Sequence, residues 1–406
     1  MQYIGAENME ICNMSECTGC SACSSSCPQK AITLLKDEKG FFHPQIKEEM
    51  CVKCGICKKV CHINKQIKTN QVKTKYIFRN NDFEVRKNSS SGGTFIPLAE
   101  VVINNNGNVF GAEFDDEFQV RHNNYKDIVN VRKFSTSKYV QSAMNESFVR
   151  VYELLTDNEL VLFSGTPCQV AGLLSYLEQK KCKTDNLITI DFICHGVGSP
   201  RFWGDCLDYY AKKYKSNIVH ANFRGKPRPG KLQNLELFFE NGRKYYAPSA
   251  NSEMFFYHFL KNYIIRESCF SCKYCKTERI SDITIGDCFK PDDKYSYLQD
   301  GYGLSQIMAN TEKGINLVKE ISSNGDMVEV NTNDYIQFNM LKNTPRPKKY
   351  NEFWNNYLKS GYKNAMKVSE YTSAKIQTKK MVLTVAYFLK IDSIIKKLVI
   401  RIKHHS

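Results

Sequence analysis

The chain has 406 residues, of which 42% are hydrophobic and 24% are charged. At about 100 to 200 residues per domain, this length predicts two to four globular domains, and the composition excludes extended disorder and fibrous repeats. The 17 cysteines are too few for a disulfide-stapled secreted scaffold but many for an intracellular enzyme. Cysteine usage of this kind indicates metal binding.

The first ten residues, MQYIGAENME, contain two acids and no basic or apolar run. They do not resemble a secretory signal, so the sequence predicts a cytoplasmic protein whose thiols stay reduced. The longest largely apolar stretch, Met381–Leu389, is far shorter than the about 20 residues that a membrane-spanning helix needs. The formal net charge is +15, and residues 366–406 hold nine lysines and arginines against two acids, so much of the positive charge lies in the tail.

Nine of the cysteines lie between Cys12 and Cys61, and eight of them form two runs with the spacing CxxCxxCxxxC. This spacing is typical of bacterial dicluster ferredoxins, in which the fourth cysteine of each run binds the cluster of the other run. Cys12 is left over, His62 replaces the proline expected after the second run, and a pair of all-cysteine zinc sites is the alternative. The pattern predicts two 4Fe-4S clusters, one held by Cys17, Cys20, Cys23 and Cys61, the other by Cys51, Cys54, Cys57 and Cys27.

A polar, lysine-rich linker over residues 65–75 follows the first cysteine region. After it we predict a strand over Tyr76–Phe78, a loop of small residues over Ser89–Thr94 and a helix over Phe95–Ile103. Alternation around Asp115-Asp116 predicts a hairpin over Val109–Val120.

Two strand-to-helix units then follow one another. Leu160–Phe163 is predicted to be a buried strand that leads through Cys168 into a helix ending near Gln179, and Leu187–Ile193 a second strand closing on Cys194. In open α/β sheets, the loops at the carboxyl ends of the strands line the ligand crevice. The two cysteines are therefore expected in one crevice.

A second cysteine region contains the spacing Cys269-x2-Cys272-x2-Cys275. Together with the two strand-end cysteines it offers enough thiols for a third 4Fe-4S cluster. A zinc knuckle or plain buried thiols are the alternatives, and Cys275 or Cys288 are alternative ligands. The predicted ligands are Cys168, Cys194, Cys269 and Cys272.

The order of these motifs resembles the coenzyme F420 hydrogenase/dehydrogenase beta-subunit family over about residues 15–310. The resemblance rests on the two ferredoxin runs, on the second cysteine region and on five short segments: Ser89–Gly93, Ser137–Ser142, Gly165–Gln169, Cys194–Gly196 and Ser281–Asp287. It implies an iron-sulfur oxidoreductase that contains FAD. Some members of the family reduce coenzyme F420, others act on a plant chlorophyll precursor, and many resemble bacterial proteins associated with polysaccharide synthesis, so the resemblance names no single electron acceptor.

The resemblance also implies flavin contacts for the small-residue loop and for the Ser-Lys-Tyr segment. A Gly/Ser loop that enters a helix presents free N–H groups to a pyrophosphate, although an ordinary turn and helix cap is an equal alternative. His195, beside a cluster cysteine, is a candidate proton donor or an ordinary hydrogen-bonding residue. The expected flavin contacts are Ser90, Ser91, Gly92, Gly93, Thr94, Lys138 and Tyr139.

The predicted fold class is α+β: a bacterial-type dicluster ferredoxin domain, then an α/β flavin-binding core and C-terminal helices. The expected domains are 1–66 (ferredoxin), 67–155 and 156–330 (the two parts of the core) and 331–406 (helical and basic). We expect an FAD-dependent iron-sulfur oxidoreductase that works with an external ferredoxin or a redox partner subunit and a small-molecule substrate. The rival is a non-catalytic electron-transfer subunit.

Two segments are rich in cations. Arg224 to Lys231 carries four in a predicted loop, suited either to an anion or to solvent. From Ile376 onward, apolar residues at helical spacing alternate with lysines, which predicts a basic amphipathic helix that contacts an anionic membrane surface or packs on the protein itself. Three oxidised clusters, each of charge about −2, would offset part of the positive charge, so we expect no nucleic-acid partner.

Overall fold

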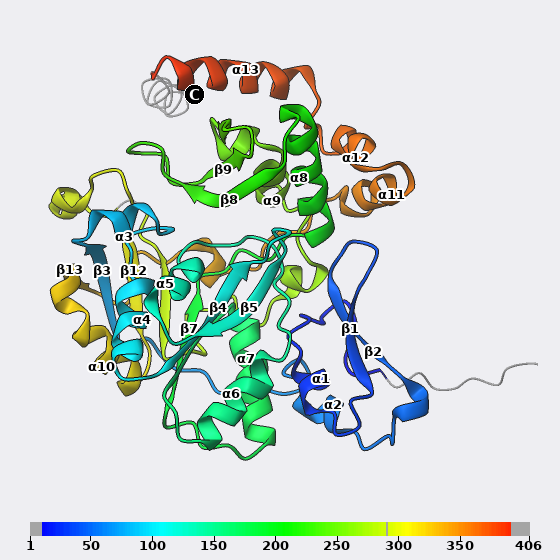
Figure 1. The fold of residues 1–406 in the computed structure, drawn as a ribbon, viewed down its shortest axis with the longest axis vertical. Helices are drawn as coiled ribbons and strands as arrows, with labels where there is room; N and C mark the ends of the chain where they lie inside the picture. The colour runs from blue at the N-terminus through cyan, green and yellow to red at the C-terminus, as the bar shows by residue number, and fades with distance from the viewer. Residues whose placement is uncertain (1–9, 290, 391–406) are drawn as a thin grey trace, which may run out of the picture.

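A mixed eight-stranded sheet forms the centre of the computed structural model, which describes residues 10–289 and 291–390 (Figure 1). The strand order is β13-β3-β12-β11-β7-β6-β4-β5. The four strands β11, β7, β6 and β4 run parallel, and the strands outside them pair antiparallel. The bounds are β3 Thr74–Asn80, β4 Asn108–Phe114, β5 Val120–Tyr125, β6 Val161–Ser164, β7 Leu187–Phe192, β11 Ile283–Asp287, β12 Ser305–Ala309 and β13 Gly325–Val330.

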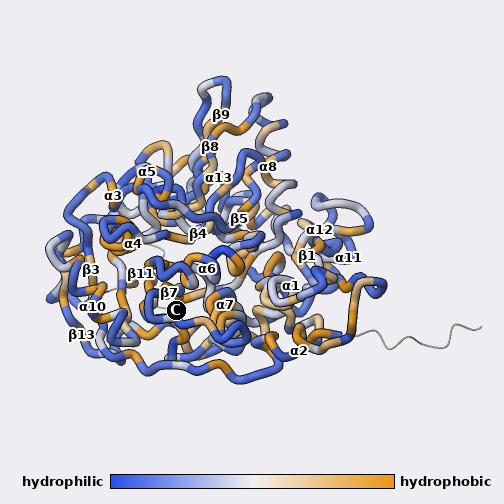
Figure 2. The backbone as a smooth tube through the Cα atoms, turned by 60° about the horizontal axis from the view of Figure 1, so that its bottom comes forward, coloured by the Kyte–Doolittle hydropathy of each residue, from blue (hydrophilic) through white to orange (hydrophobic). Residues whose placement is uncertain are grey.

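Helices cover both faces of this sheet because successive strand residues point to opposite sides. Val109 and Leu162 belong to the core on one face, whereas Phe110 and Phe163 belong to the core on the other. Hydrophobic segments gather in the interior strands and in these helices, while the peripheral loops are mostly hydrophilic (Figure 2). The first face is covered by α4 (Phe95–Asn104) and α10 (Glu312–Glu320). The second face is covered by α6 (Ser147–Thr156) and α7 (Pro167–Gln179). Two short helices, α3 (Phe83–Lys87) and α5 (Ile128–Val131), contact β3 and β5 respectively.

The N-terminal part packs against α7 and so forms one continuous core with the sheet. Close approach depends on Gly172, where a Cβ atom would lie 2.8 Å from the Cys20 sulfur. The Ser175 hydroxyl of α7 also donates to the Val60 carbonyl at 2.6 Å. The elements of this part are α1 (Ala22–Ser26), β1 (Ile32–Lys36), β2 (Phe42–Ile46) and α2 (Ile56–Val60), with β1 and β2 antiparallel.

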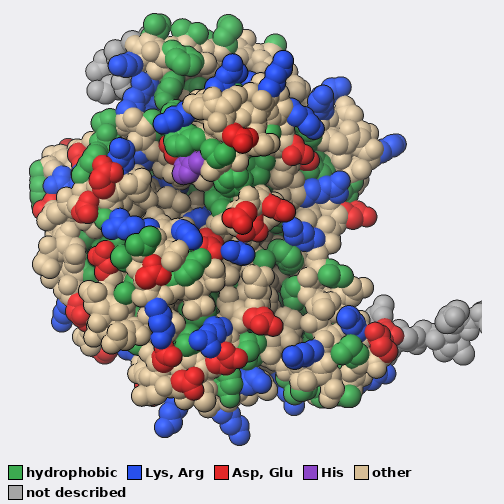
Figure 3. All heavy atoms as spheres, viewed as in Figure 1, with side chains coloured by type: hydrophobic (Ala, Val, Ile, Leu, Met, Phe, Trp, Pro, Cys, Tyr) green, Lys and Arg blue, Asp and Glu red, His purple; other side chains and the backbone are tan. Residues whose placement is uncertain are grey.

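A third part, at the top of Figure 1, is built on a three-stranded antiparallel sheet and an aromatic core. Figure 3 shows a hollow between this part and the large sheet, with side chains of both charges around it. The elements are β8 (Ile218–Gly225), β9 (Asn234–Phe239), β10 (Lys244–Tyr246), α8 (Pro200–Tyr214), α9 (Met254–Leu260), α11 (Tyr350–Ser360), α12 (Tyr362–Val368) and α13 (Ala374–Phe388).

The predicted fold class is confirmed, as are the strands and helices predicted around Cys168 and Cys194. The hairpin is longer than predicted, because its second strand begins at Val120 and runs to Tyr125. Of the predicted C-terminal helix, α13 is described, whereas residues 391–406 lie outside the described residues. None of the helices within residues 10–289 and 291–390 is long and apolar enough to cross a membrane.

Candidate functional site

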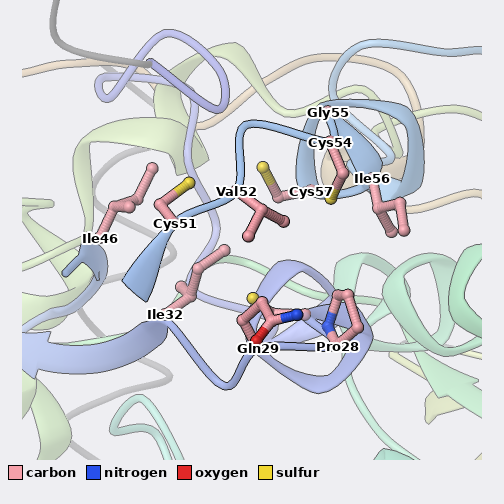
Figure 4. A pocket seen from close by; sticks show the side chains of 11 residues that line it. Pro28, Gln29, Ile32, Ile46, Cys51, Val52, Cys54, Gly55, Ile56 and Cys57 are labelled. Atoms are coloured by element: carbon pink, nitrogen blue, oxygen red, sulfur yellow. The ribbon is translucent and has the colours of Figure 1, made fainter. Parts of the chain in front are cut away.

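Four thiols from the two ferredoxin runs line one cavity of about 360 Å³ (Figure 4). Three of them come from the loop around α2, and Cys27 comes from the end of α1, in the other run. We call this the second thiol cavity. It brings together the set that the sequence predicts for one cluster: Cys27, Cys51, Cys54 and Cys57.

The remaining ferredoxin thiols line a cavity of about 340 Å³, the first thiol cavity. Cys61 reaches it from the end of α2, so each run again supplies one thiol to the other run's cavity. Cys12, which the spacing leaves over, lines this cavity as well. Five thiols therefore surround it: Cys12, Cys17, Cys20, Cys23 and Cys61.

The backbone of the two cysteine loops repeats the same unusual conformation. Left-handed residues flank the second cysteine of each run, Gly19 and Ser21 in the first (φ 66° and 72°), Lys53 and Gly55 in the second (φ 52° and 72°). Such conformations are costly for residues other than glycine and are retained where a site demands them. They wrap each loop tightly around its cavity.

Backbone N–H groups point at several of these sulfurs. The Ala31 N–H donates to the Cys27 sulfur at 3.3 Å, and those of Ala22 and Ile63 donate to Cys20 and Cys61. Such hydrogen bonds stabilise metal thiolates and set the potential of a cluster. The residues present therefore fit iron-sulfur clusters.

A third thiol cavity, of about 720 Å³, lies between the core and the N-terminal part. Cys168 reaches it from the first turn of α7, Cys194 from the end of β7, and the others from the segment around the 3-10 helix Glu267–Ser271. Thr18 and Ile63 of the N-terminal part also line it. Its thiols are Cys168, Cys194, Cys269, Cys272 and Cys275.

The third thiol cavity distinguishes Cys275 from Cys288, the two alternative ligands of the predicted third cluster. Cys275 lines it and lies in hydrogen-bonding contact with Cys272. Cys288 instead packs with Ile77, Leu298 and Leu304 in a separate apolar cluster. Of the two, only Cys275 is placed near the predicted third cluster.

Burial favours the protonated form of several of these thiols. It raises the pKa of Cys20 and of Cys269 to about 12, and that of Cys168 to about 11. Since iron binds thiolates, the positive charge of the metal must displace the protons. Among residues 10–289 and 291–390, no group of His, Cys, Asp or Glu is placed to hold a single metal ion.

Two residues that the sequence analysis gave no role join the N-terminal part to the third thiol cavity. Arg266 is buried and donates to the Cys17 carbonyl at 2.8 Å and to the Phe42 carbonyl at 2.9 Å. The Tyr274 hydroxyl lies 2.6 Å from His62 Nδ1, and His62 Nε2 lies 3.0 Å from the Thr18 hydroxyl. His62, the residue directly after Cys61, thus connects the first cysteine region to the second.

We predict that Tyr274→Phe lowers the free energy of unfolding by about 1–3 kcal/mol, because it leaves the buried His62 ring with an unpartnered nitrogen. Burial lowers the pKa of His62 to about 4, so the ring stays neutral at pH 7 and gains no compensating ion pair. Anaerobic thermal unfolding measures the effect. Tyr297→Phe, an exposed tyrosine, is the control, and equal melting temperatures for the two variants would contradict the prediction.

The expected flavin contacts gather around Arg224 of β8. Its guanidinium donates to the Ser90 carbonyl, to the Tyr139 hydroxyl at 2.9 Å and to both oxygens of Asp287 at 2.9 and 3.0 Å. The Ser90 hydroxyl lies 2.8 Å from that of Ser137, the neighbour of Lys138. The loop and the Ser-Lys-Tyr segment are therefore adjacent, although they lie far apart in the sequence.

Some of the expected contacts have a structural reason of their own. A Cβ atom on Gly92 would lie 2.3 Å from the Phe78 carbonyl oxygen, and Gly93 has φ +84°, so packing and backbone conformation alone require these glycines. The Ser91 hydroxyl donates to the Leu304 carbonyl. In contrast, the buried Thr94 hydroxyl and Arg224 Nε have no hydrogen-bond partner among the described residues. These unpartnered polar atoms fit a bound polar cofactor.

The cationic segment over residues 224–231 is not a solvated loop at its start, since the side chains of Arg224 and Lys226 are buried. Lys226 donates to three carbonyls, those of Arg86, Ser91 and Tyr302, at 2.6–2.7 Å. These donors hold the small-residue loop in place from behind. The sequence signal was the dense run of cations, but the spacing gave no sign that two of them are buried.

His195 lies in the wall of the third thiol cavity. Its Nε2 is 2.9 Å from Asn262 Oδ1, and its Nδ1 is 3.5 Å from Asn339 Nδ2. Burial lowers the pKa of His195, so the ring is neutral at pH 7. The ring is thus held between two amide side chains, and its role as a proton donor stays a prediction.

The comparisons with known proteins agree with this arrangement. Residues 16–65 match the 4Fe-4S dicluster domain, so the chain is an iron-sulfur protein. Residues 158–334 match the family of coenzyme F420 hydrogenase/dehydrogenase beta subunits, over the C-terminal part of those subunits, and the predicted family resemblance is confirmed.

A chain of the F420-reducing NiFe hydrogenase complex from Methanosarcina barkeri is similar in structure, with 15% sequence identity and a TM-score of 0.45. The similarity covers 73% of this chain and 91% of that chain. None of the curated proteins matches this sequence.

Proposed function

We propose that the chain is an iron-sulfur flavoprotein oxidoreductase. It passes electrons between the two N-terminal clusters and FAD through a third cluster, and on to a two-electron substrate such as coenzyme F420 or an unidentified metabolite. The observation that carries this proposal is the third thiol cavity. It is lined by five thiols and also by Thr18 and Ile63 of the ferredoxin domain. A metabolite of polysaccharide synthesis is a further candidate substrate, because many members of the resembled family are associated with that process.

The proposed path between clusters uses residues that bridge the two cysteine regions. Tyr274 lies between Cys272 and Cys275 in the sequence and contacts His62, which directly follows Cys61. The path from Cys61 to Cys272 or Cys275 therefore runs through covalent bonds, apart from the one hydrogen bond between His62 and Tyr274. Burial of His62 and Tyr274 excludes water from this contact, which favours electron transfer over side reactions with solvent.

At the flavin site, bound FAD would accept or donate single electrons on the side of the clusters and two electrons on the side of the substrate. The chain's own part is to hold it. Thr94, at the start of α4, has a hydroxyl without a hydrogen-bond partner in the described part of the chain, and Arg224 fixes the Ser90 and Tyr139 segments against each other. Lys138 is half-buried and donates to the Lys133 carbonyl. The amino group of Lys138 is the cation that we assign to a flavin phosphate.

The second candidate function is that of a non-catalytic electron-transfer subunit. It is favoured by Gly92, Ser91 and Lys226, whose contacts within the chain account for them without a cofactor. In both functions the redox partner is an external ferredoxin or a partner subunit, as the beta-subunit description of the matching family implies.

Anaerobic purification followed by iron, sulfide and flavin analysis separates the two functions. The protein is then mixed with reduced coenzyme F420, NAD(P)H or reduced ferredoxin, and the absorbance of the clusters is followed. Bound flavin with turnover supports the enzyme. Clusters without flavin support the electron-transfer subunit, and a chain without iron contradicts both.

We predict that FAD affinity falls as the pH rises above about 7. Burial lowers the pKa of Lys138 to about 7, so its charge is lost as the pH rises through that value. An anionic phosphate favours the charged form, so binding takes up a proton and is strongest below pH 7. Fluorescence titration of flavin-free protein measures this. Lys138→Gln should abolish the pH dependence and Lys133→Gln should retain it, whereas identical profiles for the two variants would contradict the assignment.

We also propose that α13 contacts an anionic membrane surface. One face of the helix exposes Met381, Val382, Val385 and Phe388, and the last of these is 76% exposed. On the other face Ala386 is buried, and Gln377 donates to the Tyr371 carbonyl at 2.7 Å, which holds the helix on the body of the protein. An exposed apolar stripe beside lysines is typical of interfacial helices.

Co-sedimentation with phosphatidylserine vesicles tests this contact. Removal of residues 376–406 should abolish binding, and the double change Val385→Glu and Phe388→Glu should do the same in the full chain. Val129→Glu, an exposed apolar position far from α13 in the sequence, should leave binding unchanged. Equal binding by the α13 variant and the wild type would refute the membrane contact.

A further inference from the structure

The first thiol cavity contains one thiol more than a four-iron cluster needs. Its fifth thiol, Cys12, is buried, and its segment is anchored: Asn64 Nδ2 donates to the Ile11 carbonyl at 2.7 Å and to the Lys58 carbonyl at 3.0 Å. The Cys17 N–H donates to the Asn13 carbonyl at 3.1 Å, which ties the segment to the first cysteine loop. Cys12 is thus held at the cavity.

The Cys12 thiol contacts two of the proposed ligands. It lies in hydrogen-bonding contact with the sulfurs of Cys17 and Cys61, and all three sulfurs line the same cavity. These contacts place a further sulfur directly beside two sulfurs that would bind iron. The second thiol cavity has no such neighbour among its lining residues, which include only the four predicted thiols.

We infer that Cys12 is a reserve ligand of the first cluster, which takes over an iron when Cys17 or Cys61 is lost from it. The inference rests on the proposed cluster assignment. In the exchange, the bond between iron and the Cys61 sulfur would break and a bond to the Cys12 sulfur would form, while the proton of the Cys12 thiol would pass to the departing Cys61 thiolate beside it. Charge and oxidation state stay the same, so the step needs no oxidant or reductant.

The two cavities provide a matched test, because Cys27 and Cys61 occupy the same place in their runs. The experiment measures iron and sulfide content and the electron paramagnetic resonance spectrum of anaerobically purified holoprotein. Cys61→Ala should keep the wild-type iron content and the spectrum of two interacting clusters. Cys27→Ala should lose about four irons, since nothing replaces its ligand. Cys12→Ala should keep the full content, and Cys12→Ala combined with Cys61→Ala should lose about four irons.

Cys17→Ala is a second variant for which the same retention is expected, and circular dichroism checks the fold of each. Iron loss in Cys61→Ala and Cys17→Ala equal to that in Cys27→Ala would overturn the inference and leave Cys12 as a hydrogen-bond donor only. A wild-type chain without N-terminal clusters would instead overturn the proposed function itself.

Discussion

Anaerobically purified protein is expected to contain about twelve irons per chain, and Cys168→Ala should lower this to about eight. The reason is that Cys168 supplies the third thiol cavity alone, whereas the thiols of the first two cavities all come from residues 12–61. Iron and sulfide analysis, together with the electron paramagnetic resonance signals of the N-terminal clusters, measures the change. Cys269→Ala should give the same result.

Two variants serve as controls. Cys288→Ala removes a buried thiol that packs outside the cavity and should keep all of the iron. Cys275→Ala should also keep it, since Cys194 completes the predicted set of four. A wild-type content of only about eight irons would remove the third cluster from the account and leave the flavin to exchange electrons with the ferredoxin domain directly.

Arg266→Leu is expected to undock the ferredoxin domain from the core. The change leaves the buried Cys17 carbonyl and the half-buried Phe42 carbonyl without their donor. Loss of the buried partner alone costs about 1–3 kcal/mol, so the docking free energy falls by at least about that amount. The melting temperature should fall, and proteases should cut the predicted linker, of which residues 65–73 lie ahead of β3, faster than in the wild type. Thermal unfolding and timed proteolysis under anaerobic conditions measure both.

Arg346→Leu is the matched control for this prediction. Arg346 pairs with Glu267 at 2.9 Å, but both side chains are 38% exposed, and such surface pairs contribute about 0–1 kcal/mol. If Arg266→Leu behaves like Arg346→Leu in both measurements, the buried contacts of Arg266 do not hold the two parts together.

The sequence predicts the local parts of the site well. The spacing of the ferredoxin cysteines groups the thiols of the two runs as the two cavities do, because three thiols lie within one short loop and the fourth is carried outward by the following helix. The apolar runs before Cys168 and Cys194 likewise predict β6 and β7, since a buried parallel strand reads as a continuous hydrophobic run.

The parts that the sequence did not predict are long-range contacts. The Arg224–Asp287 ion pair and the Tyr274–His62 hydrogen bond join residues 63 and 212 positions apart, and no local periodicity encodes such a pairing. Cys12 lies outside the repeated spacing, so only the fold reveals that it shares a cavity with Cys17. The three-stranded sheet of β8, β9 and β10 was missed because its pairing depends on an aromatic core assembled from distant helices.

A reductive titration most directly tests the central claim that clusters and flavin act together in one chain. Dithionite is added anaerobically to the purified protein while visible absorbance and electron paramagnetic resonance are recorded. The account predicts uptake of about five electrons per chain, one for each of three clusters and two for the flavin, with bleaching of the flavin absorbance. Uptake of about two electrons without flavin bleaching would contradict it, and would leave a ferredoxin domain attached to a core without redox groups.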